Sequence, residues 1–333
     1  MDGLTHALLG ATLAQLPSPR HCPLKRGQRL GVGALGGLFP DIDYLLFPWW
    51  PLEFLAYWHQ GPTHSLLLAP LWAGLLALAL MVHPTLRARG RWLFLLSLVG
   101  VLSHDLLDAL TGYGTQLFYP LSTTRFSADL LFVVDGYFTL LLAFCLAVLY
   151  RRPGRRLVLL PPLLYLGLLL GLKQLALYQG GTSVAIPQPF SPLHWQLIDP
   201  QRQRLLYLRL APDPIASRFS SWLGYPGWQQ GYQAGLWAQW QPYGLGSPDP
   251  IWQEAVEQVW RHPDFRPFRD FARYPYLYRL EQDLHERCVW FSDLRYDWPA
   301  LPASFRYGMC RQADGDWQLY RMRYLSERQR QQL

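Results

Sequence analysis

Long stretches without charged side chains constrain this chain more than any other feature of its sequence. Residues 66–82 carry no charged side chain, and residues 157–177 carry only Lys173. About 20 apolar residues in a helix cross the roughly 30 Å hydrocarbon layer of a bilayer, so both stretches predict membrane helices. Further apolar runs, each with its few charges near one end, occupy residues 30–47, 92–110 and 130–150. We therefore expect a polytopic α-helical membrane domain of four to six helices over residues 1–177.

The sequence changes character after residue 177. The whole chain of 333 residues is 50% hydrophobic and only 16% charged, which argues against a disordered chain, an ordinary soluble enzyme and a nucleic-acid binder. Residues 178–333, however, contain no spanning run. Asp249-Pro250 precedes an amphipathic stretch and predicts a capped helix, and alternation of aromatic and polar residues at 288–296 and 304–324 predicts strands. We expect a smaller soluble domain here, either α+β or mostly β.

Basic residues are concentrated in alternate connections of the membrane half. The loops at 18–29, 83–91 and 151–156 are rich in Lys and Arg, whereas 48–63 has neither and 111–129 has only Arg125. By the positive-inside rule, a six-segment arrangement places every basic loop on the cytoplasmic side of the inner (plasma) membrane. The C-terminal domain is then extracytoplasmic, where Cys288 and Cys310 could form a disulfide.

Ionisable residues in the membrane half recur near the outer ends of the apolar segments. A charge in hydrocarbon costs several kcal/mol, so such residues are functional candidates by default. The set comprises Asp2, His6, Asp41, Asp43, His59, His64, His104, Asp105, Asp108, Asp129 and Asp135. Because each member lies at or near the same predicted boundary, residues scattered along the first 135 positions converge on one layer.

A divalent metal site is the chemistry that this layer favours. His104 and Asp108 are four residues apart on an expected helix, so both side chains project from one face. Imidazole and carboxylate together suit Zn²⁺ or a similar cation. The predicted ligands are His6, Asp41, Asp43, His59, His64, His104 and Asp108. They exceed the needs of one tetrahedral ion, so we expect one or two; of Asp41 and Asp43, one binds metal and the other supports it.

The same residues form motifs that resemble a known family. The motifs are Asp2-x2-Thr5-His6, Pro40-Asp41-x-Asp43, His59-x-Gly61-x-Thr63-His64-Ser65 and His104-x3-Asp108. Over roughly residues 1–150 the chain resembles the YdjM/YbcI-type bacterial membrane-bound metal-dependent hydrolases. More remotely, it is similar to the zinc-dependent phospholipase C and single-strand nuclease superfamily, which implies phosphoester hydrolysis at a zinc cluster. The later His and Glu ligands of that superfamily are not recognisable as a run in this sequence.

Three further residues are candidates for catalysis. Asp105 or Asp135 could accept a proton or orient a ligand imidazole, and Arg125 could hold a phosphate oxygen. A buried Asp135–Arg125 pair is an equal alternative. The depth of the site near the headgroups favours a lipid or lipid-linked substrate. A non-catalytic zinc-stabilised scaffold and an ion or solute transporter stay as alternative interpretations, and the oligomeric state stays open.

Overall fold

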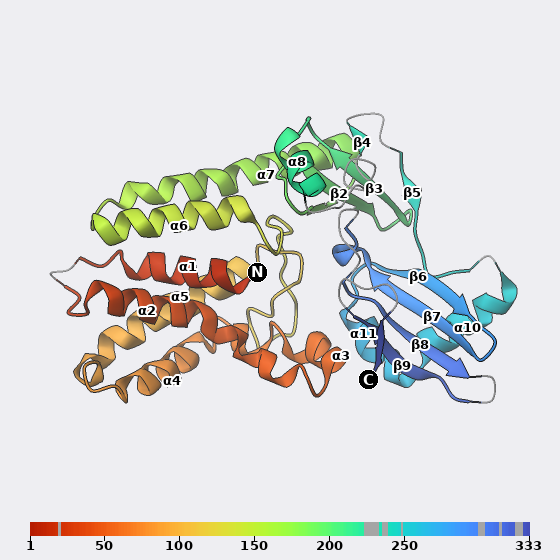
Figure 1. Cartoon of the computed structure of the whole chain (residues 1–333), viewed down its shortest axis with the longest axis horizontal. Helices are drawn as coiled ribbons and strands as arrows, with labels where there is room; N and C mark the ends of the chain where they lie inside the picture. The colour runs from red at the N-terminus through yellow and green to blue at the C-terminus, as the bar shows by residue number, and fades with distance from the viewer. Residues whose placement is uncertain are drawn as a thin grey trace. The chain divides into compact units, whose positions relative to one another are not determined.

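The computed structural model divides the chain into two compact units. It describes residues 1–18, 21–222, 233–234, 239–247, 249–298, 304–312, 315–323 and 329–333. The first unit, called the helical unit below, comprises Met1–Leu45 and Trp58–Gly171. The second, called the C-terminal unit, comprises Leu46–Tyr57 and Leu172–Leu333. Figure 1 shows that the helical unit is built from long helices and that the sheets belong to the C-terminal unit.

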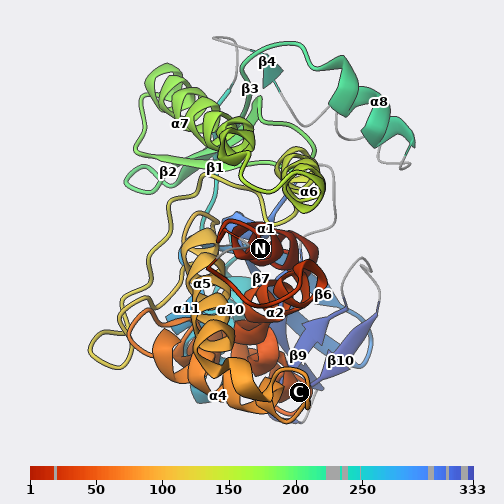
Figure 2. The ribbon, with the colours of Figure 1, turned by 90° about the vertical axis from the view of Figure 1, so that its left-hand side faces the viewer.

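Long helices lie side by side in the helical unit, and Figure 2 looks along them. They are α1 (Gly3–Ala14), α2 (Arg26–Leu38), α4 (Ala69–Met81), α5 (Gly90–Asp108), α6 (Gly136–Arg151) and the first half of α7 (Leu160–Gly180). Short helical turns connect them: η1 (Phe39–Leu46), η3 (Pro62–His64), η4 (Arg87–Arg89) and η5 (Arg156–Leu159). Helix α1 packs against α2, α5 and α6, while α5 also packs against α2 and α4.

Glycines let α1, α2 and α5 touch along their backbones. A Cβ atom on Gly33 of α2 would lie 2.4 Å from the carbonyl oxygen of Gly10 in α1. A Cβ on Gly100 of α5 would lie 2.7 Å from the carbonyl carbon of Gly36 in α2. Both distances are too short for any side chain, so only glycine permits these crossings. The three helices are thereby held close enough for short side chains at their ends to meet.

Most residues of the candidate membrane spans belong to the helical unit. Among the described residues, Arg87–Asp108 and Arg156–Gly180 are long and apolar enough to cross a membrane. A third span results if Pro51–His64 and Ala69–Met81, which meet at a bend of 76°, count as one. Helices α1 and α6 are shorter apolar helices. A helical N-terminal region with two to three candidate apolar spans is therefore confirmed, whereas the expected number of four to six helices stays a prediction.

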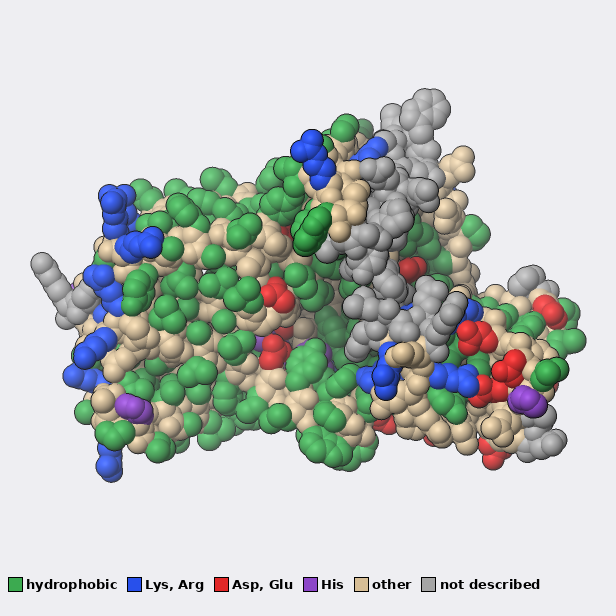
Figure 3. All heavy atoms as spheres, viewed as in Figure 1, with side chains coloured by type: hydrophobic (Ala, Val, Ile, Leu, Met, Phe, Trp, Pro, Cys, Tyr) green, Lys and Arg blue, Asp and Glu red, His purple; other side chains and the backbone are tan. Residues whose placement is uncertain are grey.

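Lys and Arg side chains gather at one end of the helical unit. In Figure 3 they lie at the far left, over the loops between α1 and α2, α4 and α5, and α6 and α7, while hydrophobic side chains cover the helices themselves. At that end Arg29 is buried and its guanidinium donates to the backbone carbonyls of Leu24, Pro17 and Cys22. The predicted clustering of basic loops at one end is thus present within the folded helical unit.

Two largely antiparallel sheets form most of the C-terminal unit, for which the sequence predicts an α+β or mostly β fold. The first contains β1 (Val184–Pro187), β2 (His194–Asp199), β3 (Arg204–Arg209), β4 (Gln233–Ala234) and β5 (Gln241–Pro242). The second has the order β10-β9-β8-β7-β6 and contains β6 (Pro275–Gln282), β7 (Glu286–Asp293), β8 (Tyr307–Gln312), β9 (Gln318–Met322) and β10 (Arg330–Gln332). The short β3–β4 pairing alone is parallel among the described strands.

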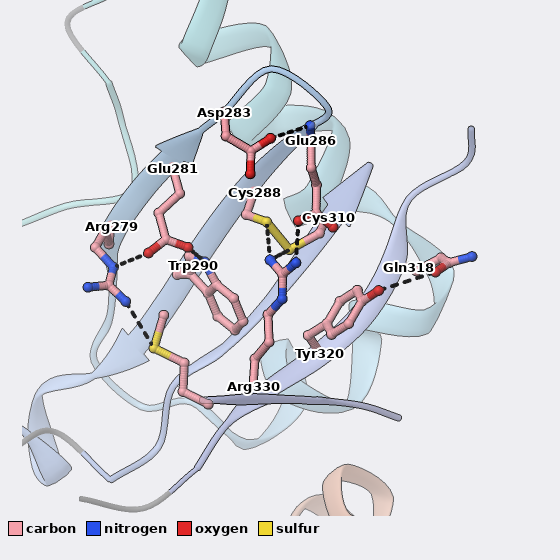
Figure 4. Close-up of a disulfide and its surroundings, with 11 residues drawn as sticks. Arg279, Glu281, Asp283, Glu286, Cys288, Trp290, Cys310, Gln318, Tyr320 and Arg330 are labelled. Atoms are coloured by element: carbon pink, nitrogen blue, oxygen red, sulfur yellow. Dashed lines mark hydrogen bonds and ion pairs between the residues drawn. A yellow bond between two sulfur atoms is a disulfide. The ribbon is translucent and has the colours of Figure 1, made fainter. Parts of the chain in front are cut away.

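Helices and a disulfide complete the C-terminal unit. Its helical elements are α3 (Pro51–Glu53), η2 (Phe54–Trp58, whose last residue belongs to the helical unit), α8 (Pro214–Trp222), α10 (Pro250–Arg261), η7 (Pro263–Phe265), α11 (Arg266–Phe271) and η8 (Leu294–Tyr296). The side chain of Asp249 caps α10 by accepting from the N–H of Ile251, as the sequence predicts. Cys288 and Cys310 face each other on β7 and β8 and form a disulfide, a pairing that the sequence alone left open (Figure 4).

Candidate metal centre

The last turn of α5 supplies the centre of the site. His104 and Asp108 are fully buried, and their four-residue spacing brings Nε2 of His104 to 3.3 Å from Oδ2 of Asp108. The N–H group of Ala109 bonds to the carbonyl of Asp105, so the helix is regular up to this point. The helix geometry predicted from the sequence is therefore present, and it places a potential metal-ligand nitrogen beside a potential metal-ligand oxygen.

Helix α1 adds a second imidazole to this pair. Asp2 caps α1 by accepting from the backbone N–H of Thr5, and the next residue, His6, lies on the first turn. Its ring stacks on that of His104, with centroids 3.6 Å apart, and its Nε2 lies 3.1 Å from Oδ1 of Asp108. A Cβ on Gly37 of α2 would lie 2.3 Å from the carbonyl oxygen of His6, so the close helix packing fixes this position.

The turn after α2 and the loop before α4 add the remaining donors. Oδ1 of Asp41, in η1, lies 3.6 Å from Nε2 of His64 and 3.8 Å from Nε2 of His104. Oδ2 of Asp43 lies 3.1 Å from Nδ1 of His59 and 3.7 Å from Nδ1 of His64. Asp41 thus faces the shared centre, while Asp43 lies behind the two imidazoles and can orient their rings.

Hydrogen bonding leaves ring nitrogens available for a cation. Nδ1 of His104 lies 2.7 Å from the carbonyl oxygen of Gly37, so it must carry the proton and donate. In the neutral ring, Nε2 of His104 then presents a lone pair. Nε2 of His104 and Nε2 of His64 are buried and have no hydrogen-bond partner among the described residues. Buried polar atoms rarely stay unsatisfied, so this pair of nitrogens fits a bound metal ion.

The donors form two adjacent groups. One comprises His6, His104 and Asp108 and the other Asp41, His59 and His64; within each, the ligand atoms lie within 4.8 Å of one another. Nε2 of His64 lies 3.5 Å from Oδ2 of Asp108, so the groups share a boundary. Six of the seven predicted ligands belong to these groups, and the seventh, Asp43, contacts His59 and His64. Nitrogen and carboxylate donors in this number could hold one or two divalent cations.

The three predicted catalytic residues lie outside the donor groups. Asp105 is buried beside His104, but its carboxylate forms no ion pair or hydrogen bond within the described part of the chain. Arg125 donates to the carbonyl oxygens of His59 and Gly114, at 3.2 and 2.8 Å. The carboxylate of Asp135 caps α6 and accepts from the hydroxyl of Tyr165 at 2.9 Å. Their catalytic roles stay predictions.

The structure adds two groups that the sequence analysis did not select. The terminal ammonium of Met1 is buried and contacts Oδ1 of Asp108. The side-chain amide of Gln60 donates to Oδ2 of the same carboxylate at 2.8 Å. No charge pattern could have singled out Gln60, because it is a neutral residue in a loop. In the sequence, only its position between His59 and Gly61 associates Gln60 with the site.

Comparison with known proteins assigns the family. A family model described as the YdjM inner membrane protein matches residues 1–176, more than half of the chain. The chain belongs to the YdjM inner membrane protein family. The match covers α1 to nearly the end of α7 and includes every donor of the two groups. No curated protein and no solved structure matches the chain. The YdjM assignment therefore confirms the family resemblance and a bilayer environment, and its description names no reaction.

Another group of potential donors lies in the C-terminal unit and differs from the YdjM site. Glu286, Cys288 and Cys310 bring ligand atoms within 4.8 Å of one another. The two sulfurs are joined in a disulfide, however, and thiolates are the form that binds metal. Figure 4 shows the guanidinium of Arg330 directed at the same sulfurs, with the carboxylate of Glu286 beside it. This group is a closed structural cluster in the oxidised protein.

Proposed function

We propose that this chain is a membrane-bound, metal-dependent hydrolase acting on phosphoester or lipid-linked substrates. The observation that carries the proposal is the pair of buried imidazole nitrogens, on His64 and His104, that lack hydrogen-bond partners among the described residues and face two carboxylates. In a purely structural cluster, protein groups would form hydrogen bonds with such nitrogens. Among divalent cations we expect Zn²⁺, because neutral imidazole and carboxylate are its usual ligands in hydrolases.

Each donor group has a distinct part in this proposal. A bound divalent cation supplies Lewis acidity that polarises a phosphoester and activates water. His6, His104 and Asp108 hold one cation, and Asp41, His59 and His64 are the candidates for a second. Asp43 orients His59 and His64 from behind. For proton transfer we favour Asp105 over Asp135, because the carboxylate of Asp135 is engaged by the N–H of Phe138 and by Tyr165.

A lipid or lipid-linked substrate fits the exposure of the site. The side chain of Asp41 is 24% exposed, whereas the other members of the donor groups are almost fully buried. The next residue, Ile42, is 46% exposed, and Leu45 of the same turn is 66% exposed. We propose that a phosphate approaches at Asp41 while an apolar tail lies against Ile42 and Leu45. Turnover of a phospholipid in mixed micelles should then exceed turnover of a water-soluble phosphoester, and the reverse preference would refute the lipid assignment.

The experiment that tests the hydrolase compares metal content and turnover in matched variants. The full chain is purified in detergent as wild type, as His104→Ala and as His83→Ala, the last being an exposed histidine outside the donor groups. We expect metal and phosphoester hydrolysis in wild type and His83→Ala, and neither in His104→Ala. Bound metal without turnover on soluble, lipid and polyprenyl phosphoesters would favour a zinc-stabilised scaffold. Wild-type protein that binds no divalent metal would remove the enzyme proposal.

We further propose that the donor groups and the C-terminal unit face the extracytoplasmic side. The basic loops gather at the end of the helical unit opposite the first turn of α1, and the disulfide favours an oxidising compartment for β7 and β8. A phosphatase reporter that folds only outside the cytoplasm should be active when fused at the C-terminus. The same reporter fused in the loop after Arg87 should be inactive. An inactive C-terminal fusion that is stably expressed would reverse the orientation.

A further inference from the structure

Gln60 has an unusual backbone conformation within the candidate metal centre. It lies between His59 and Gly61, its side chain is buried, and its φ angle is 54°. Residues other than glycine rarely adopt this left-handed conformation, and such strain is found mainly where surrounding contacts hold a side chain for a purpose. The backbone carbonyl of Gln60 accepts from the N–H of Gln116 at 2.9 Å, which holds the turn against the loop that follows α5.

The side-chain amide of Gln60 links that loop to the central carboxylate. The hydroxyl of Thr115 lies 3.0 Å from Oε1 of Gln60, and Nε2 of Gln60 lies 2.8 Å from Oδ2 of Asp108. A carboxylate only accepts hydrogen bonds, so the NH₂ group must face Asp108 and the carbonyl must face Thr115. The hydrogen bonds therefore run in one direction: the hydroxyl of Thr115 donates to Gln60, and the amide of Gln60 donates to Asp108.

We infer that Gln60 is a positioning residue for the metal ligand Asp108, an inference that rests on the metal centre of the proposed function. Oδ1 of Asp108 faces Nε2 of His6, and Oδ2 faces Nε2 of His64 and of His104. The carboxylate must keep one rotation about its Cβ–Cγ bond to serve both sides. A hydrogen bond from Gln60 to Oδ2 fixes that rotation.

A neutral donor suits this task better than a charged one. The Met1 ammonium already contacts Oδ1 of Asp108, so a further cation in place of Gln60 would add more positive charge beside the same carboxylate, and a carboxylate there would repel it. An amide directs the carboxylate without changing the charge of the site. Outer hydrogen bonds of this kind typically change metal affinity 10–100-fold when they are removed.

The test separates the amide from the backbone conformation. Gln60→Gly removes the amide but adopts a φ of 54° without strain, while Gln60→Ala removes the amide and keeps the strain. We expect both variants to bind Zn²⁺ about 10–100-fold more weakly than wild type in a chelator competition. The absorption spectrum of the Co²⁺-loaded protein should also change, because the ligand field depends on the orientation of the carboxylate.

Two further variants control for packing and for the relay. Gln116→Ala removes a neighbouring buried glutamine side chain that donates nothing to Asp108, so wild-type Zn²⁺ affinity is expected. Thr115→Val keeps the shape but removes the hydroxyl that orients Gln60, and a smaller loss of affinity, about 3-fold to 10-fold, is expected. Wild-type affinity and Co²⁺ spectrum in Gln60→Gly would overturn the inference, as would an equal loss in Gln116→Ala. Wild-type protein that binds neither Zn²⁺ nor Co²⁺ would overturn the proposed metal centre itself.

Discussion

The two units of the molecule bury charged side chains in opposite ways. In the C-terminal unit, Asp293 is fully buried and accepts from the guanidinium of Arg295 at 2.8 and 3.0 Å and from the backbone N–H of Arg273 at 2.7 Å. In the helical unit, Asp108 contacts the Met1 ammonium, the Gln60 amide and three imidazoles. Each of these imidazoles, on His6, His64 and His104, carries one buried ring nitrogen without a hydrogen-bond partner among the described residues. We call the first network closed, because protein groups supply its hydrogen-bond partners, and the second open, because some of its ring nitrogens lack such partners among the described residues.

This difference distinguishes a structural cluster from a ligand site. A closed ion pair in a protein interior is satisfied by its own hydrogen bonds, and removing one partner leaves an uncompensated charge. An open set of donors gains its missing interactions from a ligand. The same residue types therefore imply different functions, depending on whether the protein itself satisfies all their hydrogen bonds. We expect mutations in the two units to have different effects.

The largest expected effect is on the closed pair. Asp293→Ala leaves the buried guanidinium of Arg295 without its carboxylate, and we expect it to lower the stability of the C-terminal unit by about 3–5 kcal/mol. Glu257→Ala, which breaks an exposed pair with Arg261, is the matched control and should cost less than about 1 kcal/mol. Thermal unfolding in detergent, followed by tryptophan fluorescence, measures both. Equal midpoints for the two variants would contradict the closed-pair interpretation, and Zn²⁺ binding should be unchanged in each.

The disulfide is the next largest contribution and belongs to the same closed unit. Cys288 and Cys310 are 22 residues apart, and opening a loop of that length removes about 3 kcal/mol of stability. We expect the double variant Cys288→Ala/Cys310→Ala to show this loss in the same unfolding assay. Cys22→Ala, at a buried cysteine that is free, is the control and should cost about 1 kcal/mol. A double variant no less stable than the control would show that the disulfide does not hold the sheet.

Metal affinity is the property that the open network should control. His104→Ala removes a donor nitrogen, and we expect Zn²⁺ to bind more than about 100-fold more weakly, since even outer-shell changes cost up to that factor. Ligand binding raises the unfolding midpoint of the native state, so the difference in midpoint between Zn²⁺-loaded and chelator-treated protein should disappear in this variant. A difference as large as that of wild type would mean that the imidazoles are structural.

The structure brings the predicted ligands close together, and there is a physical reason why the sequence could select them. Hydrocarbon makes ionisable residues expensive, so those that occur near membrane segments are few and share a purpose. His104 and Asp108 meet because of helix periodicity alone, and the cap at Asp249 follows from an equally local pattern of residues. These features depend on residue type and spacing, which the sequence displays directly.

Other features depend on contacts between residues far apart in the sequence, which residue spacing does not reveal. Gln60 contributes a neutral amide whose partner, Asp108, is 48 residues away. Residues 46–57 belong to the C-terminal unit, although they lie within the membrane half of the sequence. Asp135 caps α6 by accepting from the backbone N–H of Phe138, a role that was not predicted from the sequence. Long-range hydrogen bonds thus define the part of the site that pattern analysis misses.

A buried imidazole of the C-terminal unit provides the smallest test of the comparison. Burial lowers the pKa of His194 to about 4, with Asp213 opposing the shift and Arg209 adding to it. Between pH 6.5 and pH 4 the unfolded chain therefore binds a proton that the folded chain refuses, and stability falls as the pH falls. We expect a loss of about 1–2 kcal/mol between pH 7 and pH 5, measured with chelator present so that metal release from the helical unit does not contribute.

The variant His194→Gln isolates this contribution. It removes the titrating ring, so its unfolding midpoint should change less than that of wild type between pH 7 and pH 5. His285→Gln, at an exposed histidine of the same unit, is the control and should retain the wild-type dependence. If His194→Gln retained it as well, the acid sensitivity would come from elsewhere. If the dependence is lost in His194→Gln alone, the acid sensitivity comes from this buried imidazole, which the C-terminal unit keeps uncharged.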